Sequence, residues 1–102
     1  MNVDEKEFTW LNKQGVSSSH GFKVQMIDRT RITYSEGSKV LTIDVEMGMS
    51  GGELCLLYAP SSFQAWDGSD VKLSSSEESR IESNFQRALS FQGVAVLSES
   101  AD

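Results

Sequence analysis

The chain has 102 residues, of which 38% are hydrophobic and 24% are charged, and its formal net charge is -6. This length and composition predict one globular domain over residues 1–102 and exclude an intrinsically disordered chain. Nine basic residues stand against fifteen acidic ones, which argues against charge-driven binding to bare nucleic acid or to an anionic membrane surface.

The predicted compartment is the cytoplasm. Cys55 is the only cysteine, so the chain forms no internal disulfide, which fits a reducing compartment. The run Met1–Lys6 is acidic and lacks the apolar core of a secretory signal. No apolar run approaches the roughly 20 residues that a membrane-spanning helix needs. We therefore expect a soluble protein that stays where it is made.

The first predicted element is a short helix with a following loop, which together occupy residues 1–21. The helix covers Asp4–Gln14, where Phe8 and Leu11 have helical spacing. Gly15 suits the left-handed cap at its C-terminal end. The serine-rich run that follows is typical of a loop.

A period-two pattern then predicts antiparallel strands. Apolar side chains alternate with polar ones over residues 22–27, 32–35 and 40–46. Glu36-Gly37-Ser38 lies between the last two runs and predicts a hairpin turn. Asp44 and Glu46 fall on the polar face of the last strand.

The next segment is predicted to hold a flexible connection and a buried strand. Glycines dominate Gly48–Gly52, which predicts the connection. Leu54–Tyr58 is a continuous apolar run, typical of a strand buried on both faces, and Pro60 ends it. Residues 61–66 fit either a short strand or a helical turn, while Asp67–Asp70 has the composition of a turn.

The clearest helix begins at Ser74 or Ser75, where a glutamate three residues on completes a capping box. Its predicted inward stripe comprises Ile81, Phe85, Ala88 and Leu89. Gly93 ends it, Val94–Leu97 forms a last strand, and the tail 98–102 is predicted to fray. The expected fold is α+β: an antiparallel sheet of five or six strands, with the C-terminal helix packed on one face and a short N-terminal helix.

No motif predicts catalysis, a cofactor or a metal ion. His20 is the only histidine, Cys55 lies in an apolar run, and no Gly-x-Ser-x-Gly turn supports a serine nucleophile. Asp67–Asp70 resembles the start of a calcium loop, but Val71 and the residues after it break the pattern. The glycine run after Met47 lacks the lysine of a phosphate-binding loop. We therefore predict that the protein is not an enzyme.

Charge segregation is the one feature that points to a binding surface. Residues 13–39 hold five bases against two acids, a balance of +3, whereas residues 44–82 hold eight acids against two bases, a balance of -6. If the second group gathers on one side, it forms an acidic patch that attracts a basic protein, and tryptophan is a frequent binding anchor. The predicted partner-binding residues are Glu46, Glu53, Trp66, Asp67 and Asp70. The alternative, equally compatible with the sequence, is that Trp66 is a core residue and the acids are scattered.

Residues 34–97, about two-thirds of the chain, resemble a known family of small bacterial proteins. The resemblance lies in a set of short motifs: Tyr34-Ser-Glu-Gly-Ser-Lys-Val-Leu, Val45-Glu46-Met47, Gly51-Gly52, Leu57-Tyr58, Ser62, Trp66-Asp67, Arg80-Ile81, Arg87-Ala88-Leu89 and Phe91-Gln92-Gly93. These motifs are similar to those of immunity proteins of polymorphic-toxin systems, in the family numbered seventy-four.

The resemblance implies an inhibitor of a cognate toxin, encoded beside it and acting in the cytoplasm of the producing cell. Such a protein binds the toxin domain stoichiometrically and occludes it, as in contact-dependent growth inhibition. Nuclease toxins are usually basic because they hold phosphates, so an acidic inhibitor would match their field. Two alternatives remain open at this point: a protein-interaction adaptor without a toxin, and a small-molecule-binding protein. Oligomeric state is not predicted.

Overall fold

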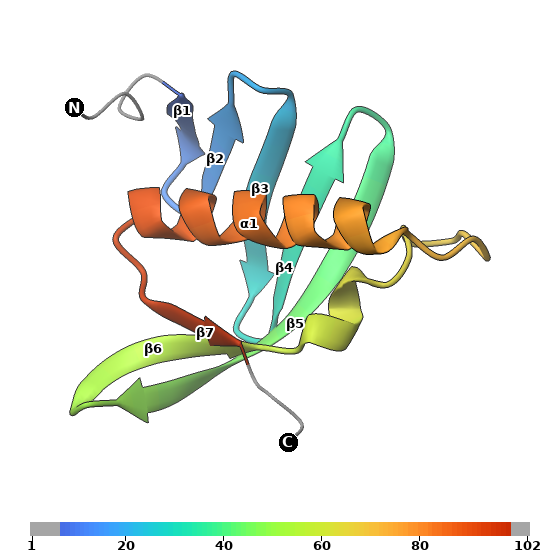
Figure 1. Ribbon diagram of the computed structural model, residues 1–102. Helices are drawn as coiled ribbons and strands as arrows, with labels where there is room; N and C mark the ends of the chain where they lie inside the picture. The colour runs from blue at the N-terminus through green and yellow to red at the C-terminus, as the bar shows by residue number, and fades with distance from the viewer. Residues whose placement is uncertain (1–6, 99–102) are drawn as a thin grey trace.

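The computed structural model describes residues 7–98. Within this range seven strands, a short 3-10 helix and an α-helix follow one another (Figure 1). In chain order they are β1 (Phe8–Asn12), β2 (Gly15–Ser18), β3 (Phe22–Asp28), β4 (Arg31–Glu36), β5 (Lys39–Ser50), β6 (Glu53–Tyr58), η2 (Pro60–Phe63), α1 (Ser75–Phe91) and β7 (Val96–Ser98).

The strands form one sheet in which each strand pairs with its neighbour in sequence. All neighbouring pairs are antiparallel except β6 and β7, which are parallel. The chain passes through η2 and α1 between β6 and β7, and α1 lies across one face of the sheet (Figure 1). The predicted α+β class and the helix cover on one face are confirmed, but the sheet is larger than the five or six strands expected.

The predicted N-terminal helix is wrong. Residues 8–12 form β1, which pairs antiparallel with β2, so the segment is a hairpin. Phe8 is buried, while Trp10 and Leu11 are half exposed. An isolated helix this short is unstable because its first turn is costly to form, whereas strand pairing supplies backbone partners from β2. The predicted loop is also shorter than expected, because Gly15–Ser18 is β2. Residues 1–6 of the predicted segment and 99–102 of the predicted tail lie outside the described range.

Gly15 serves close packing rather than a helix cap. Its backbone is not in the left-handed region. A Cβ at this position would lie 2.1 Å from Oε1 of Gln25, on the paired strand β3. The Gln25 side chain covers the glycine and exchanges hydrogen bonds with Asn12. The missing side chain therefore leaves the space that the end of the Gln25 side chain occupies.

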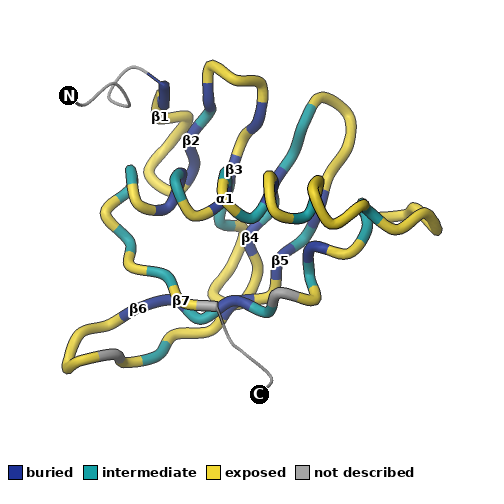
Figure 2. The backbone as a smooth tube through the Cα atoms, in the orientation of Figure 1, coloured by how far each residue is buried: buried dark blue, intermediate teal, exposed yellow. Residues whose placement is uncertain are grey.

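The core lies between α1 and the facing side of the sheet, as the period-two pattern predicts. Its strand members include Phe22, Val24, Ile32, Tyr34, Leu41, Ile43 and Val45, all of them buried. The helix contributes Ile81, Phe85, Ala88 and Leu89, which confirms the predicted inward stripe. Figure 2 shows the alternation as buried and exposed segments along β3, β4 and β5.

Both ends of α1 follow their sequence signals. Ser74 is the N-cap: its hydroxyl accepts from the backbone N–H of Glu77, and the Glu77 carboxylate accepts from the backbone N–H of Ser74. This is the predicted capping box, and its hydrogen bonds lower the pKa of Glu77. At the other end Gly93 has a φ of 81°, the left-handed conformation that glycine adopts without strain.

The segment after Val45 differs from its prediction. The expected flexible connection is instead the continuation of β5 through Ser50, followed by a tight turn at Gly51 and Gly52 with φ of 60° and 86°. These angles are those of a type I′ hairpin turn. The next run is not buried on both faces, because Leu54 is exposed. In the segment 61–66, left open as a strand or a helical turn, residues 61–63 belong to the 3-10 helix η2 (Pro60–Phe63).

Candidate functional site

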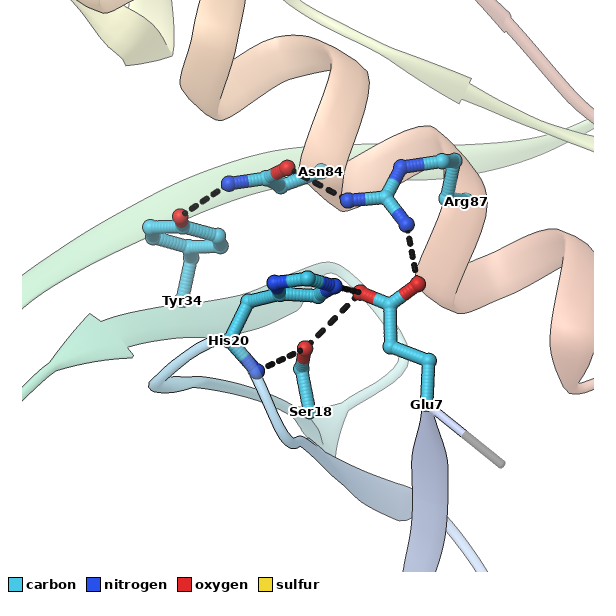
Figure 3. A network of polar contacts seen from close by, with 6 residues as sticks. All are labelled: Glu7, Ser18, His20, Tyr34, Asn84 and Arg87. Atoms are coloured by element: carbon cyan, nitrogen blue, oxygen red, sulfur yellow. Dashed lines mark hydrogen bonds and ion pairs between the residues drawn. The ribbon is translucent and has the colours of Figure 1, made fainter. Parts of the chain in front are cut away.

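Two regions concentrate functional groups, and the first is a polar network beneath α1 (Figure 3). At its centre is Glu7, whose side chain is only 5% exposed. Nη1 of Arg87 donates to Oε1 of Glu7, and Oγ of Ser18 donates to Oε2 over 2.8 Å. Nε2 of His20 lies 3.8 Å from the same Oε2. The network thereby ties the start of β1 to both β2 and α1.

The network continues along α1 to β4. Nη2 of Arg87 donates to Asn84 over 2.8 Å, and Nδ2 of Asn84 donates to the hydroxyl of Tyr34 over 3.0 Å. That hydroxyl donates to Glu36 over 2.5 Å, and Arg80 donates to the same carboxylate over 2.6 Å. The hydrogen bonds from Asn84 to Tyr34 and from Arg80 to Glu36 therefore connect α1 to β4.

These contacts shift three pKa values. Burial, together with the bond to the Glu36 carboxylate, raises the pKa of Tyr34. Burial alone would raise the pKa of Glu36, but hydrogen bonds from Arg80 and Tyr34 outweigh it, so the pKa is lowered. The same carboxylate raises the pKa of the Arg80 guanidinium. Glu36 is thus held as a carboxylate that accepts from both neighbours.

The contacts of the network stabilise the packing of α1 on the sheet and do not have the arrangement of a catalytic site. Ser18 donates directly to the Glu7 carboxylate, so His20 does not stand between a serine and an acid as it does in a hydrolase triad. The backbone N–H of His20 instead donates to Oγ of Ser18 over 2.9 Å. Between residues 7 and 98, no buried side-chain nitrogen or oxygen lacks a hydrogen-bond partner.

The predicted binding residues Trp66, Asp67 and Asp70 lie in the segment between η2 and α1. The Trp66 ring is half-buried and stacks on Tyr34 with centroids 6.2 Å apart. The Asp67 carboxylate accepts from the Thr42 hydroxyl over 2.6 Å and from the Thr42 backbone N–H over 3.2 Å. Trp66 and Asp67 therefore hold this segment against the sheet, whereas Asp70 is exposed.

The predicted residues Glu46 and Glu53 lie elsewhere, on the hairpin of β5 and β6. Glu46 pairs with Leu57 and Glu53 with Ser50, so both acids point to one face of the hairpin. Both are exposed, and neither carboxylate forms a hydrogen bond or ion pair with any other residue between 7 and 98. Along β5, Glu46 is about 13 Å from Thr42, where Asp67 is bound. The five predicted residues thus form two separate groups rather than one patch.

Several other charges are already paired within the protein. The Asp28 carboxylate accepts two hydrogen bonds from the Arg31 guanidinium, over 2.7 Å and 3.0 Å. These bonds, together with one from the Thr30 backbone N–H, lower the pKa of Asp28 to about 2. Arg80 and Arg87 pair with Glu36 and Glu7. Pairing inside the fold leaves Glu46 and Glu53 among the carboxylates available to a partner.

The same hairpin carries the second candidate region, which sequence reasoning missed. The binding ribbon, as we name residues 46–54 of β5, β6 and their turn, projects beyond β4 and α1 (Figure 1). Met47, Met49 and Leu54 are 58%, 64% and 65% exposed. Met49 pairs directly with Leu54, and Met47 with the buried Leu56, so the three share one face.

This apolar face is the continuation of the core. Val45 and its partner Tyr58 are buried on that face, and the alternation carries on to Met47 and Met49 after the helix no longer covers it. The signal was present in the sequence as an apolar residue at every second position beyond Val45. It was hidden because Gly48 and Ser50 gave the segment the composition of a loop. A Cβ at Gly48 would lie 2.8 Å from Cδ1 of Leu57, so this glycine also serves close packing.

The remaining tests for a site concern metals, membranes and relatives. Within residues 7–98 there is no group of three or more His, Cys, Asp or Glu side chains that could hold a metal ion. In the same range, no helix has the length and apolar character to cross a membrane. Comparisons with protein-family models, curated proteins and solved structures found no match.

Proposed function

We propose that this protein is an immunity protein that binds a cognate toxin domain through the binding ribbon and neutralises it. The observation that carries the proposal is the cluster of Met47, Met49 and Leu54, exposed side by side on a projecting hairpin. Large apolar side chains gathered on a surface mark interaction sites, whereas single ones are common and need no explanation. Methionine is also well suited to such a surface because its unbranched side chain adapts to a partner.

The charge of the protein supports a basic partner. The net charge is -6, and Glu46 and Glu53 are exposed on the other face of the ribbon. A nuclease domain presents lysine and arginine to phosphate, so its field would attract these carboxylates and speed the encounter. Together with the resemblance to immunity proteins, this favours a basic nuclease toxin, met in the cytoplasm of the producing cell.

The proposed mechanism is occlusion by a one-to-one complex. Opposite electrostatic fields bring the two proteins together. The methionine and leucine side chains, which become buried in the interface, then stabilise the complex. The ribbon, or the body of the domain behind it, covers the active site of the toxin. No group on this protein needs to change covalently, so one molecule of this protein is needed for each toxin domain, and inhibition at equal amounts is complete when Kd lies well below the concentration of the two proteins.

The test is a growth-rescue assay. The C-terminal domain encoded immediately upstream would be expressed with and without this protein, and growth and co-purification would be followed. We expect wild type to relieve arrest and the variant M47S/M49S/L54S to lose relief, with affinity falling at least about tenfold. The matched control is V71S, since Val71 is 74% exposed but lies outside the ribbon.

The outcomes separate the candidate functions. If the domain is toxic and wild type gives no relief, this pairing is wrong. Relief that the ribbon variant retains in full would place the binding site elsewhere. Binding without relief would favour the adaptor function. The charge-reversed variant E46K/E53K should associate more slowly at low salt, and this difference should shrink as salt is raised.

A further inference from the structure

The backbone of the binding ribbon presents an open edge along β5. The backbone N–H of Val45 donates to the carbonyl of Thr30, just before β4, over 2.9 Å. In a strand the N–H and C=O of one residue point to the same side, and the next residue points to the other. The backbone groups of Met47 and Met49 therefore point the same way as those of Val45, away from β6.

Among the described strands, none covers this edge beyond Val45. Strand β4 starts at Arg31, which pairs with Asp44, so the pairing ends before Glu46. The backbone carbonyl of Asp44 points to the opposite side, where it accepts from the backbone N–H of Ala59, just after β6. This bond confirms that the backbone groups of successive β5 residues alternate between the two edges. Two N–H and two C=O groups, those of Met47 and Met49, thus face outward from β5.

We infer that this edge of β5 receives an extended strand of the partner protein, which extends the sheet across the interface. The inference rests on the proposed function and names how its site binds. An open strand edge is a template for backbone pairing, and the exposed methionines beside it would pack against alternate side chains of the added strand.

The two faces of the ribbon specify the added strand. On the face of Met47 and Met49 its side chains would be apolar, continuing the core. On the face of Glu46 they would be lysine or arginine, because this carboxylate is exposed on β5 beside the added strand, and Glu53 is exposed on the same face one strand further away. The occupant is therefore a strand that alternates apolar and basic residues. A second copy of this chain fits poorly, since each copy carries a net charge of -6.

The other edges of the sheet are less suited to strand addition. Strand β1 is five residues long, and its pairing is irregular between Trp10 and Asn12. Irregular pairing and short length are the usual protections of an edge strand. Strand β7 is only three residues long. The β5 edge has no such irregularity, because its pairing with β6 is regular from Val45 to Ser50, and within residues 46–50 it carries no lysine or proline.

The experiment uses amide hydrogen exchange, followed by NMR on the wild-type protein. The probe is a short synthetic peptide that alternates valine and lysine. We expect saturating peptide to slow exchange of the Met47 and Met49 amides about tenfold, because each amide gains a backbone partner. The Gly48 amide faces β6 and should stay unchanged. A peptide with glutamate in place of lysine should bind more weakly.

Three results would overturn the inference: unchanged exchange at Met47 and Met49, protection at β1 or β7 instead, or protection that appears without peptide as the protein self-associates. A second variant pair tests the edge in the complex. M47A and M47P both remove the methionine side chain, but only M47P also removes the outward backbone N–H. Because that N–H points away from β6, M47P breaks no hydrogen bond to β6. We expect M47P to weaken binding of the upstream domain further than M47A, with circular dichroism verifying that each folds.

Failure of the inference can be told from failure of the proposed function. Rescue by wild type, with M47P and M47A equal and peptide without effect, would reject strand addition and leave immunity standing. Peptide protection at Met47 and Met49, with no rescue by wild type, would reject this toxin pairing and retain the strand-binding edge.

Discussion

The half of the sheet under α1 and the binding ribbon share the same alternation of apolar residues, but those residues are buried in the first region and exposed in the second. In β3 and β4, alternate apolar side chains such as Val24 and Tyr34 are buried against the helix. In the ribbon, Met47 and Met49 continue that alternation and are exposed. The difference is whether a second layer covers the face, because a sheet buries one face only by packing against another element. A strand that extends beyond the covering helix therefore leaves its apolar face exposed.

The largest expected contrast compares the cores of the two regions. Phe85 of α1 is fully buried, and its ring lies 5.2 Å from Tyr58 and 5.6 Å from Phe63. F85A should lower the free energy of unfolding by about 3–5 kcal/mol, through lost burial and a cavity. M49A should change it by less than about 0.5 kcal/mol, because Met49 is mostly exposed. Urea denaturation measures both, and equal losses would mean that the ribbon is part of the core.

An intermediate effect is expected in the polar network. R87M should cost about 1–3 kcal/mol, because it leaves the buried Glu7 carboxylate without its charged partner. The cost is below that of a fully buried pair, since the Arg87 side chain is 39% exposed. R29M is the matched control, as Arg29 is exposed in the turn between β3 and β4. A loss no larger in R87M than in R29M would show that Glu7 is solvated on its own.

The smallest expected effect separates two of the acids predicted for the binding site. D67A should cost about 1 kcal/mol, because the Asp67 carboxylate holds Thr42 through two hydrogen bonds. D70A should be neutral within about 0.5 kcal/mol, since Asp70 is an exposed residue of the segment between η2 and α1. Thermal unfolding measures the pair. For binding, D70K should leave affinity for the upstream domain unchanged, and a loss would extend the site from the ribbon to this loop.

Much of the fold was predictable where local signals agree with one another. The capping box at Ser74, the inward stripe of α1 and the glycine at its end are set by neighbours a few residues away, so periodicity and capping rules found them. The hairpin at Gly37 followed from a turn sequence between two alternating runs. The N-terminal hairpin did not, because its apolar residues also fit a helical spacing and only pairing with β3 selects the strands.

The candidate site was predictable only in part. Glu46 and Glu53 do lie exposed on one face of a hairpin, but Trp66 and Asp67, chosen on the same grounds, are used in packing. Residue type cannot distinguish these cases, since a carboxylate that accepts from a nearby hydroxyl and one that faces water have the same sequence signature. The apolar half of the ribbon was missed altogether, because Gly48 and Ser50 gave the end of β5 the composition of a loop.

Local pattern and amino-acid totals were enough to predict the α+β class, the capped C-terminal helix, the alternation of the central strands and the acidic charge. Only the tertiary structure decided the length of the sheet, the burial of Glu7 beneath α1 and the exposure of Met47, Met49 and Leu54. Those depend on where strands and helix end relative to one another, and such distances are set by contacts between residues far apart in the chain.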